Sequence, residues 1–258
     1  MLLVASPDVV DLWLAFYEGI DAKTLERYRG LLTPDEMTQQ RRFHFARDQV
    51  RYLVTRALAR TVLSRYAAVR PEEWRFTTSA HGRPEIANSG WSDGWVSFNI
   101  SHTAGLIALG VTGGHALGID TEHVGLRRAP LDIADAFFSP QEAQALRIEA
   151  ADTRHERFFD YWTLKESYIK AKGKGLSIPL DQFSFSFPSP GTIGLSCRPE
   201  LDDDPARWLF WQVRPSRDHV AAICVARTPG ATQRLVTRSI VPLGPVGSFE
   251  CAVLRRSA

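Results

Sequence analysis

The segment from Trp162 to Leu176 constrains the fold of this chain more than any other part of the sequence. It contains no proline or glycine until Gly173, so it predicts a helix that ends close to that residue. Residues four positions apart share one helix face. Glu166 and Lys170 are therefore expected to point the same way, and the fold has to bring their partners to that face.

A second polar segment, Gly118-Ile119-Asp120-Thr121-Glu122, lies upstream and predicts a strand. Residues two apart in a strand face the same side, so Asp120 and Glu122 should present their oxygens together. Magnesium prefers oxygen ligands and usually takes one or two carboxylates with phosphate and water. If folding brings Glu166 to this pair, the three acids predict a magnesium-assisted reaction on a phosphate ester. The alternative is a solvated strand end and a separate surface ion pair.

The N-terminal part predicts a strand followed by a long helical region. Residues 9–17 alternate loosely between apolar and polar side chains, which is typical of a strand. Thr33 can cap a helix, and Glu36 occupies the position that completes a capping box. No proline or glycine then follows Pro34 until Pro71, so residues 34–66 should form one long helix or two helices joined by a bend.

The remaining elements repeat this order loosely, without a sequence repeat. The turn Thr112-Gly113-Gly114-His115 predicts a hairpin between the strands on either side of it. The segment from Arg227 onward is rich in Pro, Gly, Ser and Arg and is expected to be partly disordered. The other expected elements are strands at 74–77, 95–100, 106–111, 116–121, 183–187, 208–213 and 220–226, and a helical region at 133–172 that breaks near Ser139-Pro140.

Charge is concentrated in one stretch of the chain. The formal net charge is only +2, but residues 41–70 contain eight arginines and one acid, Asp48. Such a block attracts anions. A nucleic-acid-binding module built on this helix is one alternative, although no RNA-recognition aromatic motif accompanies the arginines.

The cysteines and the apolar segments indicate where the protein works. Cys197, Cys224 and Cys251 are far apart and form no C-x-x-C pair, which argues against a disulfide framework or a structural zinc site. No apolar run approaches the ~18 residues of a membrane span. The N-terminus lacks the positive region of a signal peptide. These features predict a cytoplasmic protein with no membrane partner.

Ser101 and His102 follow the strand expected at 95–100. Their hydroxyl and imidazole groups are both suited to a phosphate, although His102 could equally be a buried histidine bonded to backbone. Neighbouring strand residues point in opposite directions, and the G-x-S-x-G elbow is absent from the sequence, so the pair is not a serine-hydrolase dyad.

Three of these motifs together resemble the signature of a known family. Asn99-Ile100-Ser101-His102-Thr103, Gly118-Ile119-Asp120-Thr121-Glu122 and Trp162 to Lys170 occur in the order and spacing of the Sfp-type phosphopantetheinyl transferases, of the holo-acyl-carrier-protein synthase superfamily. The likeness covers roughly residues 33–187 and also includes Arg41-Arg42-Phe43, Asp48 with Arg51, His81-Gly82-Arg83-Pro84 and Gly173-Lys174-Gly175-Leu176-Ser177.

The resemblance implies an α+β fold, a pseudo-dimer of two similar halves with the active site in the cleft between them. Residues 1–114 would hold the nucleotide end of coenzyme A, and residues 115–227 would carry the metal and catalytic groups. Residues 228–258 would be a C-terminal tail. The boundary falls at the turn that contains Gly113.

The resemblance also implies the reaction. Such enzymes move the phosphopantetheine arm of coenzyme A onto a serine of an acyl- or peptidyl-carrier protein with magnesium, or manganese as the alternative ion, and release adenosine 3′,5′-bisphosphate. The matching residues are Asp120, Glu122 and Glu166 for the metal, Glu166 and Lys170 for catalysis, and Arg51, Arg83, Ser101, His102, Lys165 and Lys170 for coenzyme A. Glu166 matches a residue that is either the third metal ligand or the general base; we favour the base.

One departure and several open points accompany the resemblance. Glu36 and Gln39 stand where some members have lysines, so more of the nucleotide binding falls to Arg51 and Arg83. The implied partners are coenzyme A and a carrier that docks beside the cleft, against apolar residues after Leu131, with a monomeric enzyme and no nucleic acid. A non-catalytic relative is the other alternative. The carrier, its fatty acid, polyketide or nonribosomal peptide pathway, and the use of acylated coenzyme A stay open.

Overall fold

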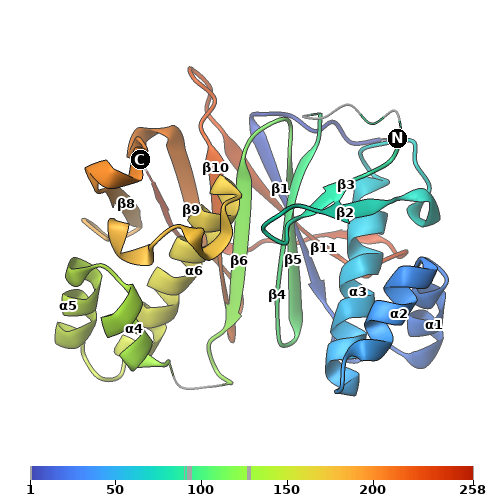
Figure 1. Cartoon of the computed structure of the whole chain (residues 1–258), viewed down its shortest axis with the longest axis horizontal. Helices are drawn as coiled ribbons and strands as arrows, with labels where there is room; N and C mark the ends of the chain where they lie inside the picture. The colour runs from blue at the N-terminus through green and yellow to red at the C-terminus, as the bar shows by residue number, and fades with distance from the viewer. Residues whose placement is uncertain (1, 90, 92–94, 127–128, 258) are drawn as a thin grey trace.

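Two mixed β-sheets stand next to each other in the middle of the molecule, and each is covered by helices on its outer face (Figure 1). The computed structural model describes residues 2–89, 91, 95–126 and 129–257. The first sheet has the order β12-β11-β1-β5-β4, from Val246–Ser248, Arg234–Ile240, Val9–Phe16, Leu106–Thr112 and Ser97–Thr103. A separate two-stranded ribbon joins β2 (Phe76–Thr78) to β3 (Pro84–Ile86).

The second sheet has six strands in the order β6-β10-β9-β13-β8-β7. These strands are Leu117–His123, His219–Ala226, Trp208–Ser216, Ala252–Ser257, Thr192–Cys197 and Phe183–Ser186. β4 and β6 are therefore the edge strands of two different sheets, and they lie side by side at the centre of the molecule (Figure 1).

The first half carries three helices, α1 (Ala22–Arg29), α2 (Pro34–Arg42) and α3 (Ala46–Leu63). Thr33 accepts from the Glu36 amide and Glu36 accepts from the Thr33 amide, so the expected capping box is confirmed. The chain bends at residues 43–45, so the helical region predicted at 34–66 is two helices. α1 was missing from the prediction, although its cap Asp21 accepts from the Thr24 amide in the usual way.

The second half carries α4 (Leu131–Phe137), α5 (Pro140–Ile148) and α6 (Arg154–Lys172). The expected break at Ser139-Pro140 is confirmed, because Ser139 caps α5 in a box with Glu142. α6 ends at Gly173, whose φ of 67° is the left-handed conformation that glycine adopts at helix ends. The lysine–glycine run thus stops the helix where the sequence predicted.

Three apolar clusters hold the layers together. One packs α3 on the outer face of the first sheet, with Trp13 and Leu58 fully or almost fully buried. Another packs α6 on the second sheet around Tyr168. The third contains side chains from both sheets, among them Leu12 and Ile223, and joins the two halves. The expected α+β fold of two similar halves is confirmed by this arrangement.

Two predictions from the sequence are wrong, one about a hairpin and one about the C-terminal segment. The turn at residues 112–115 does not close a hairpin, because β5 pairs with β1 and β4 while β6 pairs with β10. Both edges of β5 are already occupied, so the chain crosses to the other sheet at this turn. The segment after Arg227 is also ordered: it forms β11 and β12 in the first sheet and β13 in the second.

Candidate active site

α6 lies directly against β6, because Gly118 has no side chain. A Cβ at Gly118 would stand 1.9 Å from the Ser167 carbonyl oxygen and 2.4 Å from the Ala171 amide nitrogen. Since side chains alternate along a strand, the face of β6 that carries Gly118 also carries Asp120. The close packing therefore brings Asp120 to the face of α6 that carries Glu166 and Lys170.

Asp120 is almost completely buried, and only one of its two oxygens has partners. Its Oδ1 accepts from Lys170 Nζ at 2.7 Å and from Ser101 Oγ at 3.0 Å. Its Oδ2 is buried and lacks a hydrogen-bond partner within the described part of the chain. A buried carboxylate oxygen without a partner is costly unless a cation or donor arrives there. Asp120 is thus suited to receive a positively charged ligand.

Glu166 is electrostatically coupled to Asp120. Burial raises its pKa, the Asp120 charge raises it further, and the Lys170 ammonium partly offsets the increase. A divalent cation between the two carboxylates would relieve both effects. Among the residues described here, no three His, Cys, Asp or Glu side chains form a ready metal cluster. The buried Asp120 Oδ2 and the nearby Glu166 carboxylate are oxygen ligands of the kind that magnesium takes, with phosphate and water completing the shell. Glu122 lies two residues beyond Asp120, on the same face of β6.

Side chains on the two faces of β4 point into two different parts of the site. Ser101 points toward β6 and α6, where its hydroxyl donates to Asp120 and accepts from Lys170 Nζ at 3.2 Å. It also accepts from the Thr121 amide at 3.2 Å, so its donor and both acceptor positions are used within the protein. His102 points the other way and lines a cavity of 310 Å³.

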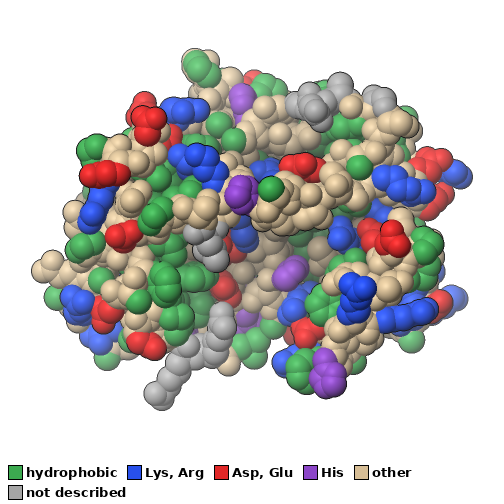
Figure 2. All heavy atoms as spheres, viewed as in Figure 1, with side chains coloured by type: hydrophobic (Ala, Val, Ile, Leu, Met, Phe, Trp, Pro, Cys, Tyr) green, Lys and Arg blue, Asp and Glu red, His purple; other side chains and the backbone are tan. Residues whose placement is uncertain are grey.

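That cavity offers cations and an apolar wall. Arg51 and Arg56 line it together with His102, and Arg51 is held by Asp48 at 2.8 Å. Burial and the neighbouring Arg51 and Lys170 charges lower the pKa of His102, so the imidazole is neutral near pH 7. The remaining lining comes from Phe43, Tyr52, Thr55, Gly82, Pro84 and Ile100. Figure 2 shows charged and histidine side chains gathered in the middle of the face of the molecule drawn there, between β6 and α3.

Arg83 joins the two halves. Its guanidinium donates to the Phe98 carbonyl at 2.8 Å and to the Lys170 carbonyl at 3.2 Å, and it therefore fixes the end of α6 to β4. It also lines a smaller cavity of 160 Å³ with walls from both halves, including Asn99 and Gly175. This cavity shares Gly82, Pro84 and Ile100 with the larger one, so the two are adjacent.

Lys165 is not brought to this site. Its side chain is 0% exposed, and Nζ contacts Glu142 at 2.7 Å. The ammonium also donates to the carbonyls of Leu180 at 2.6 Å and Phe183 at 2.8 Å, which uses all three of its protons. Its partners lie around α5 and β7, so the lysine that the sequence placed on coenzyme A is part of the interior of the second half.

Most of the arginine block is also engaged within the protein. Arg60 is fully buried, with its guanidinium 2.6 Å from Glu36, and Arg56 lies 3.6 Å from the same carboxylate. Arg65 donates to the Gly244 carbonyl, and Arg70 pairs with Glu73. The glutamate that departs from the family pattern is therefore needed to neutralise a buried arginine.

Two residues that lie within the predicted motifs were given no role of their own from the sequence. Gly118 sets how closely α6 approaches the acids, and an isolated glycine inside a strand is a known signal of such an approach. Asn99 accepts from the Ile119 amide at 2.8 Å across the junction of the two sheets. That contact leaves no periodic signal in the sequence.

Comparison with known proteins identifies the family of the chain. The family model "4'-phosphopantetheinyl transferase, N-terminal" matches residues 21–112, and the model "4'-phosphopantetheinyl transferase superfamily" matches residues 116–224. The 4'-phosphopantetheinyl transferase Sfp of Bacillus subtilis (strain 168) is 32% identical over 203 residues, which are 78% of this chain and 85% of that protein.

Two further relatives come from other organisms. The 4'-phosphopantetheinyl transferase HetI of Nostoc sp. is 28% identical over 85% of this chain and 88% of that protein. A phosphopantetheinyl transferase of Thraustochytrium sp. is 29% identical over 85% of this chain and 79% of that protein. The chain belongs to the 4'-phosphopantetheinyl transferase superfamily and is an enzyme that transfers phosphopantetheine from coenzyme A onto carrier proteins.

Proposed function

We propose that the transfer takes place at the junction of the two halves and depends on magnesium, with manganese as the alternative ion. The observation that carries this proposal is the half-satisfied Asp120 carboxylate beside Glu166 and Lys170. Asp120 and Glu122 would hold the cation, which when bound supplies positive charge to the pyrophosphate of coenzyme A.

The nucleotide end of coenzyme A is proposed to occupy the 310 Å³ cavity of the first half. Arg51 suits a phosphate there, because its planar guanidinium donates two parallel hydrogen bonds and Asp48 already holds it in place. His102 adds a donor from β4. Arg83 stands between this cavity and Lys170, so its remaining N–H groups are available to the same ligand.

The chemical step then follows from the residues on α6. Glu166 takes the proton from the carrier serine, a role helped by its raised pKa, since a base works best when its pKa lies near the working pH. The serine oxygen attacks the phosphorus that carries the pantetheine arm. The bond from this phosphorus to the bridging oxygen breaks, and adenosine 3′,5′-bisphosphate leaves. Lys170 stabilises the negative charge that spreads over the transferred phosphoryl group.

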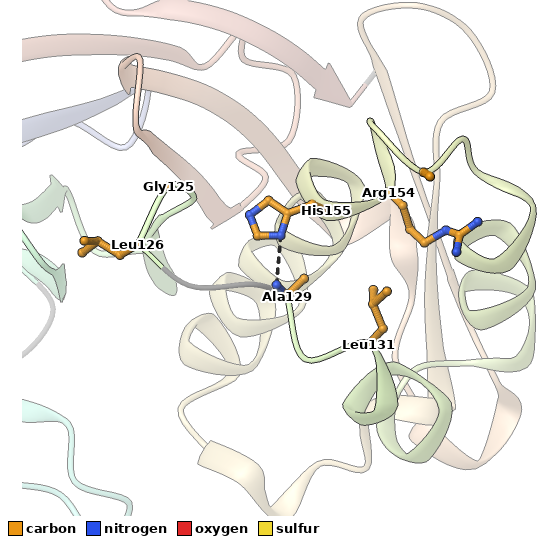
Figure 3. A pocket seen from close by; sticks show the side chains of 7 residues that line it. Gly125, Leu126, Ala129, Leu131, Arg154 and His155 are labelled. Carbon is orange, nitrogen blue, oxygen red and sulfur yellow. Dashed lines mark hydrogen bonds between the residues drawn. The ribbon is translucent and has the colours of Figure 1, made fainter.

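The carrier protein is proposed to dock beside this junction, over the loop that follows β6. A cavity of 640 Å³ opens there, and exposed Leu126 and Leu131 lie at its edge (Figure 3). His155 of α6 accepts from the Ala129 amide at 2.9 Å, which ties Ala129 to α6 (Figure 3). We expect the carrier to be acidic near its serine, and Arg154 adds positive charge to the lining of this cavity. Such charges mainly assist encounter.

We infer that the enzyme works in the cytoplasm, since Cys197, Cys224 and Cys251 are all free thiols. We also propose that it acts as a monomer. In the described parts of the chain, no helix has the length and apolar character needed to cross a membrane.

The transfer assay tests the proposed function directly. The protein is incubated with coenzyme A, magnesium and a panel of unmodified carriers, and each carrier is weighed by mass spectrometry. We expect the added arm on at least one carrier and none when a chelator removes the metal. Transfer that continues undiminished with the chelator would contradict the magnesium dependence.

The substitution Asp120→Asn tests the metal site itself. It keeps the shape of the side chain but removes its charge, so transfer should fall on the order of 100-fold or more while the protein remains folded. Asp35→Asn is the matched control, because Asp35 is an exposed acid in the first turn of α2. Near-normal turnover of Asp120→Asn, measured at saturating coenzyme A, would show that the metal assignment is wrong.

A further inference from the structure

The two halves meet along β4 and β6 without a backbone ladder. Among the described residues, β4 pairs only with β5 and β6 pairs only with β10. The amides of Ile119, Thr121 and His123 point away from β10, so they need acceptors elsewhere. Unpaired edge amides are a liability in any sheet.

Side chains of β4 supply those acceptors. Asn99 Oδ1 accepts from the Ile119 amide at 2.8 Å, Ser101 Oγ from the Thr121 amide at 3.2 Å, and Thr103 Oγ1 from the His123 amide at 3.2 Å. Each pair is separated by 20 residues in sequence, so the two strands run parallel in one fixed register. We call these three hydrogen bonds the seam.

The seam brackets both acids of the site. Asp120 lies between the amides of Ile119 and Thr121, and Glu122 lies between those of Thr121 and His123. A shift of one residue along β4 would turn all three acceptors to the opposite face. The bare backbone of Gly110 on β5 lets Ile119 approach closely, since a Cβ there would stand 2.7 Å from the Ile119 side chain. The seam therefore sets where the acids of the second half stand relative to the first.

We propose that Asn99, Ser101 and Thr103 are positioning residues for the transfer: they hold the strand that carries Asp120 and Glu122 in register with the half that binds the nucleotide. This inference rests on the proposed function, because one ligand has to reach from the first half to the acids of the second. Ser101 also orients Asp120 and Lys170 directly, whereas Asn99 and Thr103 act through the backbone of β6.

Thr103 gives the cleanest test, because it is absent from the linings of both cavities and, among the residues that the structure describes, its hydroxyl contacts only the His123 amide. Thr103→Val keeps the shape and removes the acceptor, while Thr103→Ser keeps the acceptor. With magnesium in excess, calorimetry should show coenzyme A affinity reduced about fivefold to tenfold in Thr103→Val and near the wild-type value in Thr103→Ser. Adenosine 3′-phosphate, which lacks the pyrophosphate, should bind both variants within about twofold of wild type.

Amide exchange gives a readout that does not depend on activity. In the wild-type protein, NMR should show slow exchange at Ile119, Thr121 and His123, and the exchange at His123 should become at least about tenfold faster in Thr103→Val. Fast exchange of all three amides in the wild type would overturn the seam. Unchanged coenzyme A affinity in Thr103→Val, or equal weakening of both ligands, would overturn its positioning role. A wild-type protein whose coenzyme A affinity ignores magnesium would instead contradict the proposed metal site.

Discussion

Lys170 connects the charges of the site at the level of single residues. It pairs with Asp120 at 2.7 Å, donates to Ser101, and its own carbonyl receives the Arg83 guanidinium. About a third of its side chain is exposed, so it can turn from Asp120 toward a phosphate without crossing the interior. Its charge also limits the rise in the pKa of Glu166. Binding of a cation at Asp120 would release Lys170 for the transferred phosphoryl group.

Glu166→Gln should separate catalysis from stability. The pKa of Glu166 is raised above its ordinary value of 4.5, so the folded state favours the protonated form. The contribution of Glu166 to the free energy of unfolding is complete below the pKa that this group has in the unfolded chain. It is lost as the pH rises through the higher pKa of the folded state. Without magnesium, Glu166→Gln should therefore be more stable than wild type at pH 8, with the difference vanishing toward pH 4. A gain of about 1 kcal/mol corresponds to a melting temperature about 2–4 °C higher.

The same variant distinguishes a base from a metal ligand. We expect turnover to fall about 10²–10⁴-fold, the usual contribution of a general base. Calorimetry of coenzyme A binding with and without magnesium should show the metal effect retained. Loss of the metal effect together with turnover would identify Glu166 as a ligand instead. If the difference in melting temperature between Glu166→Gln and the wild type did not change between pH 4 and pH 8, the raised pKa of Glu166 would be contradicted.

The two faces of α6 contribute to the active site and to the interior of the second half, respectively. The face toward β6 bears Glu166 and Lys170, and the face toward β7 and α5 bears Lys165, which is fully buried against Glu142. The helix ends at Gly173, which adopts the left-handed conformation. The helix is therefore packed on both sides, which restricts the movement of the proposed catalytic residues Glu166 and Lys170.

Gly118→Ala should separate α6 from β6. The new Cβ would collide with helix backbone at 1.9 Å and 2.4 Å, and backbone has little freedom to move. We expect a loss of about 3 kcal/mol in the free energy of unfolding, measured by urea titration, and a large loss of transfer activity. Gly30→Ala is the control, since its Cβ would meet only the Arg27 carbonyl at 3.4 Å and its φ is ordinary for a helix end. A Gly118→Ala protein as stable as Gly30→Ala would contradict the close packing.

Lys165→Met should act on stability and leave coenzyme A binding intact. Breaking a fully buried ion pair by removing one partner costs about 3–5 kcal/mol, because the other charge stays buried. The Glu142 carboxylate would then keep only its bonds to Ser139 and the Phe185 amide. Melting temperature and calorimetry of coenzyme A binding measure the two effects. A weakened affinity with an unchanged melting temperature would return Lys165 to the ligand site.

At the scale of the molecule, the end of the chain ties both halves together. β11 runs parallel to β1 in the first sheet, where Arg238 pairs with Asp11 at 3.0 Å. Asp11 in turn accepts from Tyr66 at 2.7 Å. β13 enters the second sheet between β9 and β8, and Arg255 pairs with Asp160 of α6 at 3.0 Å. Each sheet thus depends on a strand from the last part of the chain.

The sequence predicted what local rules govern. The capping box at Thr33 and the end of α6 at Gly173 are local features, and each led to a correct element. The order and spacing of three motifs led to the family. The seam was not predictable, because it joins side chains to amides of a different sheet. The hairpin prediction failed at Gly113 because the turn chemistry is the same whether the next strand returns to its neighbour or crosses over. The composition of the C-terminal segment predicted partial disorder, although the segment contains the strand Arg234–Ile240.

A chain that ends at Arg227 tests this dependence. It would retain both regions matched by the family models, residues 21–112 and 116–224, so those matches alone suggest that it suffices. The structure predicts the opposite, because the truncation strips β11 from β1 and β13 from β9, and leaves Asp11 and the buried Asp160 without Arg238 and Arg255. Burial already raises the pKa of Asp160, and removal of Arg255 would raise it further.

We therefore expect the truncated chain to lack cooperative thermal unfolding in circular dichroism and to transfer no arm. Val241→Ser in the full chain is the control, since Val241 lies in the same segment and is 49% exposed. Supplying residues 228–258 as a separate peptide should restore part of the cooperative transition, because the lost strands bind by the same hydrogen bonds and apolar contacts. A truncated chain that melts and transfers like the full protein would show that each sheet is complete without these strands.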